Sequence, residues 1–375
     1  MIIGIDGNEA NVDRKVGISE YSFELIKQFK DSASSHSFQI YLKNLPNTDM
    51  PVKTGSFTYK VFGPKKLWTQ IALPFKLFTE KDKPDIFFSP GHYAPRFSPI
   101  PSVISIMDLA FFHFPEYFTK KDLQQLHSWT RYSVKKARAI ITISQASKND
   151  IINLYDVPKE RVHVVYPGIK DKPSLSPHVY PMKELQTQYS ISGNFVLFVG
   201  TLQPRKNIVR LIEAFSILKK KKKVAEDLEL VIIGKKGWNY EEILQAPEKY
   251  QVSDSVKFLD FVSDDHLALF YKNALCFAWP SLYEGFGLPV LEAMSYNCPV
   301  ITSNVSSLPE AGGDAAIYVD PKSTEDIAEK IEKVVSSKKL REEMIEKGKK
   351  HIKNFSWEKS AKETLAILED IGNNK

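Results

Sequence analysis

Short apolar runs alternate with longer segments of helical periodicity throughout the first half of the chain. The runs are nearly continuous rather than alternating, which is typical of strands covered on both faces of a parallel sheet. Between the first two runs, apolar residues from Ile18 to Phe29 recur at helical spacing, so this segment is predicted to pack on the sheet. The predicted strands are residues 2–5, 38–42, 86–89, 102–107, 140–143 and 162–165.

The second half repeats this pattern after a break in composition. The break is DKPSLSPHVYP, and four prolines fall between Pro167 and Pro181, which is typical of a linker. A helix is predicted at 208–218, and the last amphipathic helix at 357–371. The predicted strands are residues 195–199, 228–233, 256–258, 275–278, 300–302 and 316–319.

Length and composition fit two α/β domains with full cores. The chain has 375 residues, of which 43% are apolar. We predict a first domain at 1–170, a linker at 171–190 and a second domain at 191–356. No apolar run approaches the ~18 residues of a membrane span, and MIIGIDG does not resemble a signal peptide. Cys276 and Cys298 are predicted to be buried thiols. We therefore expect a soluble, cytoplasmic protein, with association to a membrane left open.

The net charge of +6 favours phosphorylated ligands or an anionic membrane surface. Nucleic acid is not an expected partner, because the basic residues are scattered and no recognition motif accompanies them. The one dense run, Lys219 to Lys223, is interpreted as the solvated end of a helix.

Residues 64–78 combine large apolar side chains with Lys65, Lys66 and Lys76. This composition fits a core-packing helix interrupted by Pro74. The alternative is an amphipathic helix at the inner surface of a membrane or along an acceptor groove.

A turn with two glycines stands at the centre of residues 279–299, WPSLYEGFGLPVLEAMSYNCP. Pro289 is suited to be the first residue of the helix that follows. Glycines leave backbone N–H groups uncovered, and a helix N-terminus adds partial positive charge, so a phosphate is predicted to bind here. The alternative is a tight bend without a ligand. The turn consists of Gly285, Phe286 and Gly287.

Two carboxylates flank this turn. Glu292 lies one turn into the predicted helix among apolar neighbours, so it needs hydrogen-bond donors, and the two hydroxyl groups of a ribose are suited to it. Glu284 precedes the helix and would point toward the group that the phosphate carries. In the alternative without a ligand, Glu284 caps the turn and Glu292 is an ordinary half-exposed helix residue.

Adjacent cations follow the first predicted strand of the second half. Arg205 and Lys206 lie in the polar loop between that strand and the next helix. An arginine fork and a compact ammonium at a helix N-terminus suit a diphosphate. The alternative is a pair of solvated loop charges.

The full pattern of these residues resembles the E-x7-E signature of retaining glycosyltransferases, in particular family 4 (glycosyl transferase group 1). The resemblance extends from the loop at Gly17 through FVGTLQPRKN to NFSWEKSAKETL. The residues that match the signature are Glu284, Gly285, Phe286, Gly287, Leu288 and Glu292.

The resemblance implies a GT-B fold, an α/β architecture of two Rossmann-like parallel-sheet domains facing across a cleft. The second domain would hold the nucleotide sugar and the first the acceptor, and the last helix, within 357–375, would cross back to the first domain. In the family, the loop matching Gly17 contacts the donor phosphates. The loop of Arg205 and Lys206 resembles the family's own donor-phosphate loop.

The first half contains the candidate acceptor contacts and a departure from the family. The proline-rich loop 89–101 follows a strand, so its side chains His92, Tyr93 and Arg96 are candidate acceptor contacts. Where the family usually has a sugar-contacting histidine before an aspartate, this chain has Met107, which can neither donate a strong hydrogen bond nor hold a proton. Asp108 either caps a turn or takes a hydroxyl proton.

The implied activity is hexosyl transfer with retention of configuration, from a GDP- or UDP-linked sugar to a glycan or lipid-linked acceptor in polysaccharide assembly. Mannose is favoured by the tail LPEAGGDAAIYVDP. Arg205, Lys206 and the glycine N–H groups would stabilise the departing diphosphate, so we predict no metal and no cofactor beyond the donor. Glu284 would hold the sugar hydroxyls. The alternatives are a nucleotide-sugar-binding partner without transfer activity, which Met107 motivates, and a sugar-nucleotide epimerase of related fold.

Overall fold

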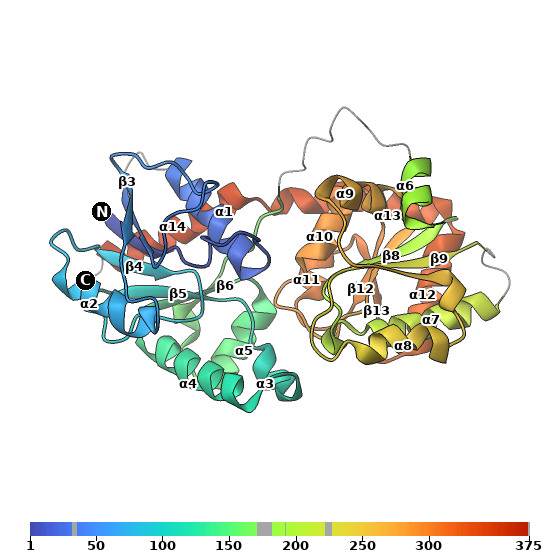
Figure 1. The fold of residues 1–375 in the computed structure, drawn as a ribbon, viewed down its shortest axis with the longest axis horizontal. Coiled ribbons are helices and arrows are strands. Elements are labelled where there is room, and N and C mark those ends of the chain that lie inside the picture. The colour runs from blue at the N-terminus through green and yellow to red at the C-terminus, as the bar shows by residue number, and fades with distance from the viewer. Residues whose placement is uncertain (32–35, 171–181, 192, 222–226, 374–375) are drawn as a thin grey trace. The chain divides into compact units, whose positions relative to one another are not determined.

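The computed structural model describes residues 1–31, 36–170, 182–191, 193–221 and 227–373, which form two compact units (Figure 1). Unit 1 is Met1–Gly168 together with Phe355–Lys375, and unit 2 is Ile169–Asn354. Within the linker predicted at 171–190, residues 171–181 lie outside the described residues, and Met182–Tyr189 form helix α6. Of the lysine run, 222 and 223 also lie outside them.

Unit 1 contains a parallel sheet in the order β3-β2-β1-β4-β5-β6-β7. Ile3, Ile5 and every residue of β5 are buried, which explains the uninterrupted apolar runs in the sequence. The strands are β1 (Ile2–Asp6), β2 (Ser37–Leu42), β3 (Phe57–Val61), β4 (Ile86–Ser89), β5 (Ser102–Ile106), β6 (Ala139–Thr142) and β7 (Val162–Val164).

Helices cover this sheet, and the last of them comes from the far end of the chain. Helix α14 packs against α1 and against strands β4 and β6. The helices of unit 1 are α1 (Ile18–Asp31), α2 (Leu73–Thr79), α3 (Ala110–His113), α4 (Lys120–Lys136), α5 (Gln145–Tyr155) and α14 (Trp357–Asn373), with a π-helical turn η1 (Trp68–Ala72) and the 3-10 turns η2 (Pro115–Tyr117) and η3 (Lys159–Arg161).

Unit 2 contains a second parallel sheet in the order β10-β9-β8-β11-β12-β13. Its strands are β8 (Phe195–Val199), β9 (Glu229–Ile233), β10 (Val256–Leu259), β11 (Cys276–Trp279), β12 (Val300–Ser303) and β13 (Ala316–Val319). Its further helices are α7 (Ile208–Lys220), α8 (Glu241–Lys249), α9 (Asp264–Asn273), α10 (Leu288–Ser295), α11 (Leu308–Gly312), α12 (Thr324–Ser336) and α13 (Lys338–His351), with the 3-10 turns η4 (Pro204–Lys206), η5 (Ser253–Ser255) and η6 (Ile352–Asn354).

The predicted fold class, α/β with two Rossmann-like parallel sheets, is confirmed. The sequence analysis missed one strand of the first sheet, β3. This strand lies at the sheet edge and pairs only with β2 among the described strands. Its residues Thr58 and Lys60 are half exposed, so it lacks the continuous apolar run that marks the central strands.

Each sheet has one point at which the strand order reverses. In unit 1 the chain runs from β1 outward through β2 and β3, then returns to the other side of β1 with β4. In unit 2 the same reversal occurs between β8 and β11. In open α/β sheets, ligands bind outside the carboxyl ends of the strands at such a switch point. We therefore expect ligand sites at the loops after β1, β4, β8 and β11.

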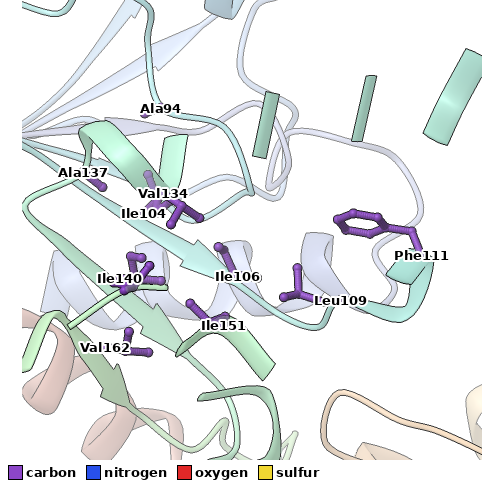
Figure 2. Close-up of a cluster of buried hydrophobic side chains, with 11 residues drawn as sticks. Ala94, Ile104, Ile106, Leu109, Phe111, Val134, Ala137, Ile140, Ile151 and Val162 are labelled. Carbon is purple, nitrogen blue, oxygen red and sulfur yellow. The ribbon is translucent and has the colours of Figure 1, made fainter. Parts of the chain in front are cut away.

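A buried apolar cluster holds the loop that follows β5 in place (Figure 2). Leu109 and Phe111, just beyond that strand, are buried together with residues of β5, β6 and the surrounding helices. These contacts fix the backbone on which Met107 and Asp108 lie. Within the described residues, no helix has the length and apolar character needed to cross a membrane.

Candidate functional site

The loop after β8 is bound tightly to its neighbours. The amide of Leu202 donates to the carbonyl of Lys235, and Asn207, in the left-handed conformation with φ of 60°, precedes α7. Asparagine tolerates this conformation better than most residues. Its side-chain amide donates to the carbonyl oxygens of Pro280 (2.9 Å) and Pro321 (2.7 Å). Asn207 therefore joins the loops that follow three strands of the sheet.

The glycine turn after β11 has the predicted form with one correction. Gly287 has φ of 111°, and a Cβ there would lie 2.8 Å from Cδ2 of Leu308, so a side chain at this position would be strained and would clash. Helix α10 begins at Leu288, so Pro289 is its second residue rather than its first. Proline is compatible with that position because the first N–H groups of a helix have no partner within the helix.

An ion cluster joins the two loops. Lys206 Nζ lies 2.6 Å from Glu284 Oε1, and Arg205 Nη1 lies 3.0 Å from Glu284 Oε2. The hydroxyl of Ser281 donates to Glu284 Oε1 at 2.6 Å. In sequence, Lys206 and Arg205 are 78 and 79 positions away from Glu284. They meet it because β8 and β11 are neighbouring parallel strands. We call Arg205, Lys206, Glu284 and Ser281 the ion cluster below.

The pKa of Glu284 shows how strongly the cluster is coupled. Burial by itself would raise this pKa, but Lys206, Arg205 and the hydrogen bonds from Lys206 and Ser281 outweigh it and lower the pKa to about 2. Glu284 and Lys206 are both buried. The carboxylate is therefore ionised at any physiological pH, and the cluster carries one net positive charge.

An aromatic stack lies beneath the cluster. Lys206 Nζ is 4.5 Å from the centroid of the Trp279 ring, and that ring stacks on Phe198 at 4.8 Å. The flat face of the indole attracts the ammonium. Lys206 is thus held from one side by a carboxylate and from another by an aromatic ring.

Glu292, the second predicted carboxylate, has a different partner. It lies in α10, is half buried, and its Oε2 accepts a hydrogen bond from the hydroxyl of Tyr271 at 3.2 Å. Tyr271 is fully buried and stacks on Tyr296 at 5.6 Å. Burial and the negative charge of Glu292 raise the pKa of Tyr271 well above its ordinary value, so the phenol keeps its proton and remains a donor.

The remaining residues of the glycine turn provide backbone and packing. Phe286 is buried, and the hydroxyl of Ser307 lies 2.8 and 2.9 Å from the carbonyl oxygens of Glu284 and Phe286. The amide of Glu284 donates to the hydroxyl of Ser306 at 3.2 Å. Serines from the loop after β12 therefore fix the backbone of the turn and leave its conformation preformed.

Gly17 and Asp108 belong to unit 1. Gly17 precedes α1 with φ of 56°, and a Cβ built on it would have nothing within 4 Å. Space is therefore present beside this residue, just before the N-terminus of α1, and its contact with the donor phosphates stays a prediction. Asp108 Oδ1 accepts the amide of Ala110, the first residue of α3, at 2.9 Å, so this carboxylate closes a local turn before that helix.

The candidate acceptor side chains interact with one another and with neighbouring helices. His92 Nε2 lies 3.2 Å from the carbonyl oxygen of Asp108. Tyr93 packs edge to face on Trp129, and the Arg96 guanidinium lies over the ring of Tyr132. These side chains follow β4, at the switch point of the first sheet.

Asp6 is a candidate that the sequence analysis missed. It is the last residue of β1, and its Oδ1 accepts the amide (3.1 Å) and side-chain nitrogen (2.7 Å) of Asn8. Burial raises its pKa to about 6 although these hydrogen bonds oppose the shift, and Glu9 adds to it. The sequence feature that could have identified Asp6 is its position at the end of a buried strand. In the folded sheet this end lies at the switch point.

The supporting residues of the donor side were also missed. Tyr271 gives no sequence signal, because a tyrosine in an amphipathic helix is usually a core residue. Ser281, Ser306 and Ser307 appear as ordinary loop serines. In the described ranges, no group of three or more His, Cys, Asp or Glu side chains is placed to hold a metal ion.

Comparison with known proteins places the chain in a family. Residues 184–351 match the model "Glycosyl transferases group 1", and residues 20–172 match "Glycosyltransferase Family 4". The O-antigen chain mannosyltransferase B of Escherichia coli is 32% identical over 286 residues, which cover 75% of this chain and 73% of the relative. The O-antigen chain mannosyltransferase RfbU of Salmonella typhimurium is 29% identical over 58% of this chain and 56% of its own length.

Solved structures agree on the fold. Sucrose-phosphate synthase from Thermosynechococcus elongatus superposes with a TM-score of 0.74 over the full length of both chains at 16% identity. HepE of Anabaena, solved in complex with UDP and glucose, gives a TM-score of 0.74 at 18% identity over 98% of this chain and 99% of its own. The two family models and the Escherichia coli relative together show that the chain belongs to the group 1 glycosyltransferases of family 4, hexosyltransferases of GT-B fold.

Proposed function

We propose that this chain is a retaining mannosyltransferase that moves its sugar from a nucleoside diphosphate, GDP or UDP, to a glycan or lipid-linked acceptor in polysaccharide assembly. Its mannosyltransferase relatives support the sugar, and O-antigen chain assembly in their names supports the acceptor class. In this proposal unit 2 binds the donor and unit 1 the acceptor. The single observation that carries it is the ion cluster at the switch point of unit 2.

Charge is the first argument for the donor. Two cations and one carboxylate leave the cluster with one net positive charge, and the turn at Gly285–Gly287 adds backbone N–H groups at the start of α10. A departing diphosphate gains negative charge as the bond to the sugar breaks. Preformed positive groups at this position stabilise that charge in the transition state without a metal ion. The proposed role of Arg205 and Lys206 is to hold the diphosphate.

Glu284 has a more limited role than the sequence analysis expected. A carboxylate offers about four acceptor positions, and Lys206, Arg205 and Ser281 take three of them. About one position is left for a sugar hydroxyl. We therefore propose that Glu284 mainly orients the two cations and contributes a single hydrogen bond to the transferred sugar.

Glu292 is suited to the ribose of the donor. The hydrogen bond from Tyr271 holds one of its oxygens and so orients the carboxylate in its half-buried position. A half-buried carboxylate with one fixed partner binds a neutral diol without the repulsion that it would exert on a phosphate. Tyr271 is in this proposal a positioning residue.

The chemical step needs no enzyme nucleophile. An acceptor oxygen forms its bond to the anomeric carbon on the face that the diphosphate leaves, the bond from that carbon to the phosphate oxygen breaks, and a phosphate oxygen takes the acceptor proton. Met107 cannot act as a nucleophile under the sugar. In this proposal Asp108 lies beside the acceptor. Its backbone carbonyl oxygen contacts His92 Nε2, and its Oδ1 accepts the amide of Ala110.

Thermal unfolding with GDP, UDP and ADP in the presence of a chelator tests the donor site. A nucleotide at ~100 times its dissociation constant stabilises the fold by about 2.7 kcal/mol, a rise of a few degrees. We expect one nucleotide to give this rise in the wild type, a smaller one in Tyr271→Phe and none in Glu292→Ala. Labelled sugars on the same base then test transfer.

Other results would favour other functions. Absence of a shift with every nucleotide would contradict the donor site. Donor binding without transfer or slow hydrolysis would indicate a binding partner, which is the alternative that Met107 motivates. Conversion of the sugar nucleotide without acceptor would indicate an epimerase.

A further inference from the structure

The segment from Trp68 to Thr79 in unit 1 is helical throughout and is buried on one face only, and Leu67 precedes it in a left-handed turn. A π-helical turn, Trp68–Ala72, leads directly into α2, Leu73–Thr79, so the segment is not the single helix that the sequence predicted over 64–78. On the inner face, Trp68, Leu73 and Leu77 pack in a buried cluster with Tyr41 and Phe87 of the sheet. The core of unit 1 is therefore packed without side chains from the outer face of this segment.

The outer face is also apolar. Leu67, Ile71, Phe75 and Phe78 expose 48%, 56%, 69% and 53% of their surfaces. Positions 71, 75 and 78 have the i, i+4, i+7 spacing of a single helix face. Single exposed apolar residues are common, but three that recur at helical spacing, with Leu67 exposed in the turn before them, mark an interaction surface.

Lysines surround these apolar residues in sequence. Between Lys60 and Lys83 there are six lysines and two acidic residues, Glu80 and Asp82. Glu80 pairs with Lys60 (3.3 Å) and Lys76 (3.0 Å). The other four lysines, on either side of the apolar residues in sequence, have exposed side chains; they are Lys65, Lys66, Lys81 and Lys83.

We infer that this face, defined by Leu67, Ile71, Phe75 and Phe78, docks on an anionic lipid surface. When the segment lies on the lipid surface, its apolar side chains enter the boundary between headgroups and acyl chains, while the flanking lysines contact anionic headgroups. Charge complementarity selects this occupant over a second copy of the chain, because a two-fold contact through the same face would bring the lysines of both copies together. The inference is independent of the donor site, since all of these residues lie in unit 1.

Sedimentation of the purified full-length chain with vesicles tests this docking. We expect binding to vesicles of phosphatidylcholine with 30% phosphatidylglycerol to be at least tenfold stronger than binding to phosphatidylcholine alone. Phe75→Gln with Phe78→Gln should reduce binding at least tenfold. Lys65→Gln with Lys66→Gln should reduce it roughly 5- to 30-fold, because each lysine near an anionic surface contributes about 1 kcal/mol.

Matched variants distinguish vesicle binding through this surface from nonspecific adsorption and from the effects of unfolding. Phe261 exposes the same 69% of its surface as Phe75 but lies in unit 2, so Phe261→Gln should leave vesicle binding unchanged. Lys338→Gln with Lys339→Gln, an exposed pair in α13, serves as the control for charge. All variants should keep the wild-type Tm and nucleotide-induced shift, which reports on the donor site separately.

Three results would overturn the inference. The first is equal sedimentation of the wild type with both kinds of vesicle. The second is unchanged binding in the double phenylalanine variant. The third is a wild-type dimer in light scattering, without lipid, that the double phenylalanine variant abolishes, because the occupant would then be a second copy. In each case an intact nucleotide shift would leave the proposed function standing.

Discussion

The two switch points of this molecule share a topology and differ in how much of the site is already built. At the β8/β11 edge, two cations, a carboxylate and a serine form a largely buried cluster of mutual bonds, in which the pKa of Glu284 is lowered. At the β1/β4 edge, the structure has an open glycine at Gly17 and an aspartate, Asp6, whose pKa is raised. The same fold thus has a preformed cluster of charges at one edge and fewer bonded groups at the other. Under the proposed function, the first edge would hold the donor and the second the acceptor.

The largest expected effect is at the β8/β11 edge. Lys206→Met keeps much of the side-chain volume over Trp279 but removes the ammonium. We expect kcat/KM to fall about 10²- to 10³-fold, the usual cost of losing one group that stabilises developing negative charge. Lys236→Met, at an exposed lysine after the neighbouring strand β9, is the control and should have little effect. Wild-type activity in Lys206→Met would remove the basis for treating this edge as the catalytic one.

The second test uses the lowered pKa of Glu284. Its pKa is about 2 in the folded chain against an ordinary 4.5, so the carboxylate contributes stability above pH 4.5 that is lost as the pH falls toward 2. At pH 6 we expect Glu284→Gln to lower the free energy of unfolding by about 3 kcal/mol. Urea unfolding between pH 6 and pH 3 should show this difference shrinking. A difference that stays constant with pH would mean that the charge of Glu284 is not what the cluster requires.

The smallest expected effect has the opposite sign and lies on the other edge. The pKa of Asp6 is raised from 3.8 to about 6, so its contribution is most favourable below pH 3.8 and is lost as the pH rises through 6. Asp6→Asn should therefore raise the free energy of unfolding at pH 7.5 by roughly 1 to 2 kcal/mol, less than the full shift implies because Asp6 keeps some contact with water. At pH 4 the two proteins should differ little. A variant that is less stable at pH 7.5 would show that the hydrogen bonds to the ionised carboxylate of Asp6 outweigh the cost of its burial.

The fold followed from the sequence wherever burial was complete. Strands such as β4 and β8 are apolar on both faces, so their positions could be predicted to within a residue. Strand β3 was missed because FTYKV alternates apolar and polar residues, as a half-exposed edge strand does, and lacks the continuous apolar run that marks the central strands. Helix α6 was not predicted, because the proline-rich segment before it favoured a linker over the whole stretch.

The charged residues of the ion cluster could be predicted, but Ser281 and the bonds within the cluster could not. Arg205 and Glu284 are brought together by the pairing of β8 with β11, and strand order is a property of the folded sheet rather than of either loop. For the same reason the sequence analysis assigned Glu284 to the sugar rather than to the cations. The hydrogen bond of Tyr271 to Glu292 depends on how α9 and α10 lie in unit 2, which no local pattern encodes.

The position of α14 bears on how the chain is made. Unit 2 is one continuous segment, whereas unit 1 is completed by a helix that follows unit 2 in the chain and packs against α1, β4 and β6. At a synthesis rate of about 5–20 residues per second, the ribosome takes tens of seconds to pass through unit 2. During that interval the surfaces of α1 and β4 that α14 later covers are exposed on the nascent chain. The first unit to begin folding is thus the last to be finished, and chaperone contacts during synthesis are expected on that uncovered face.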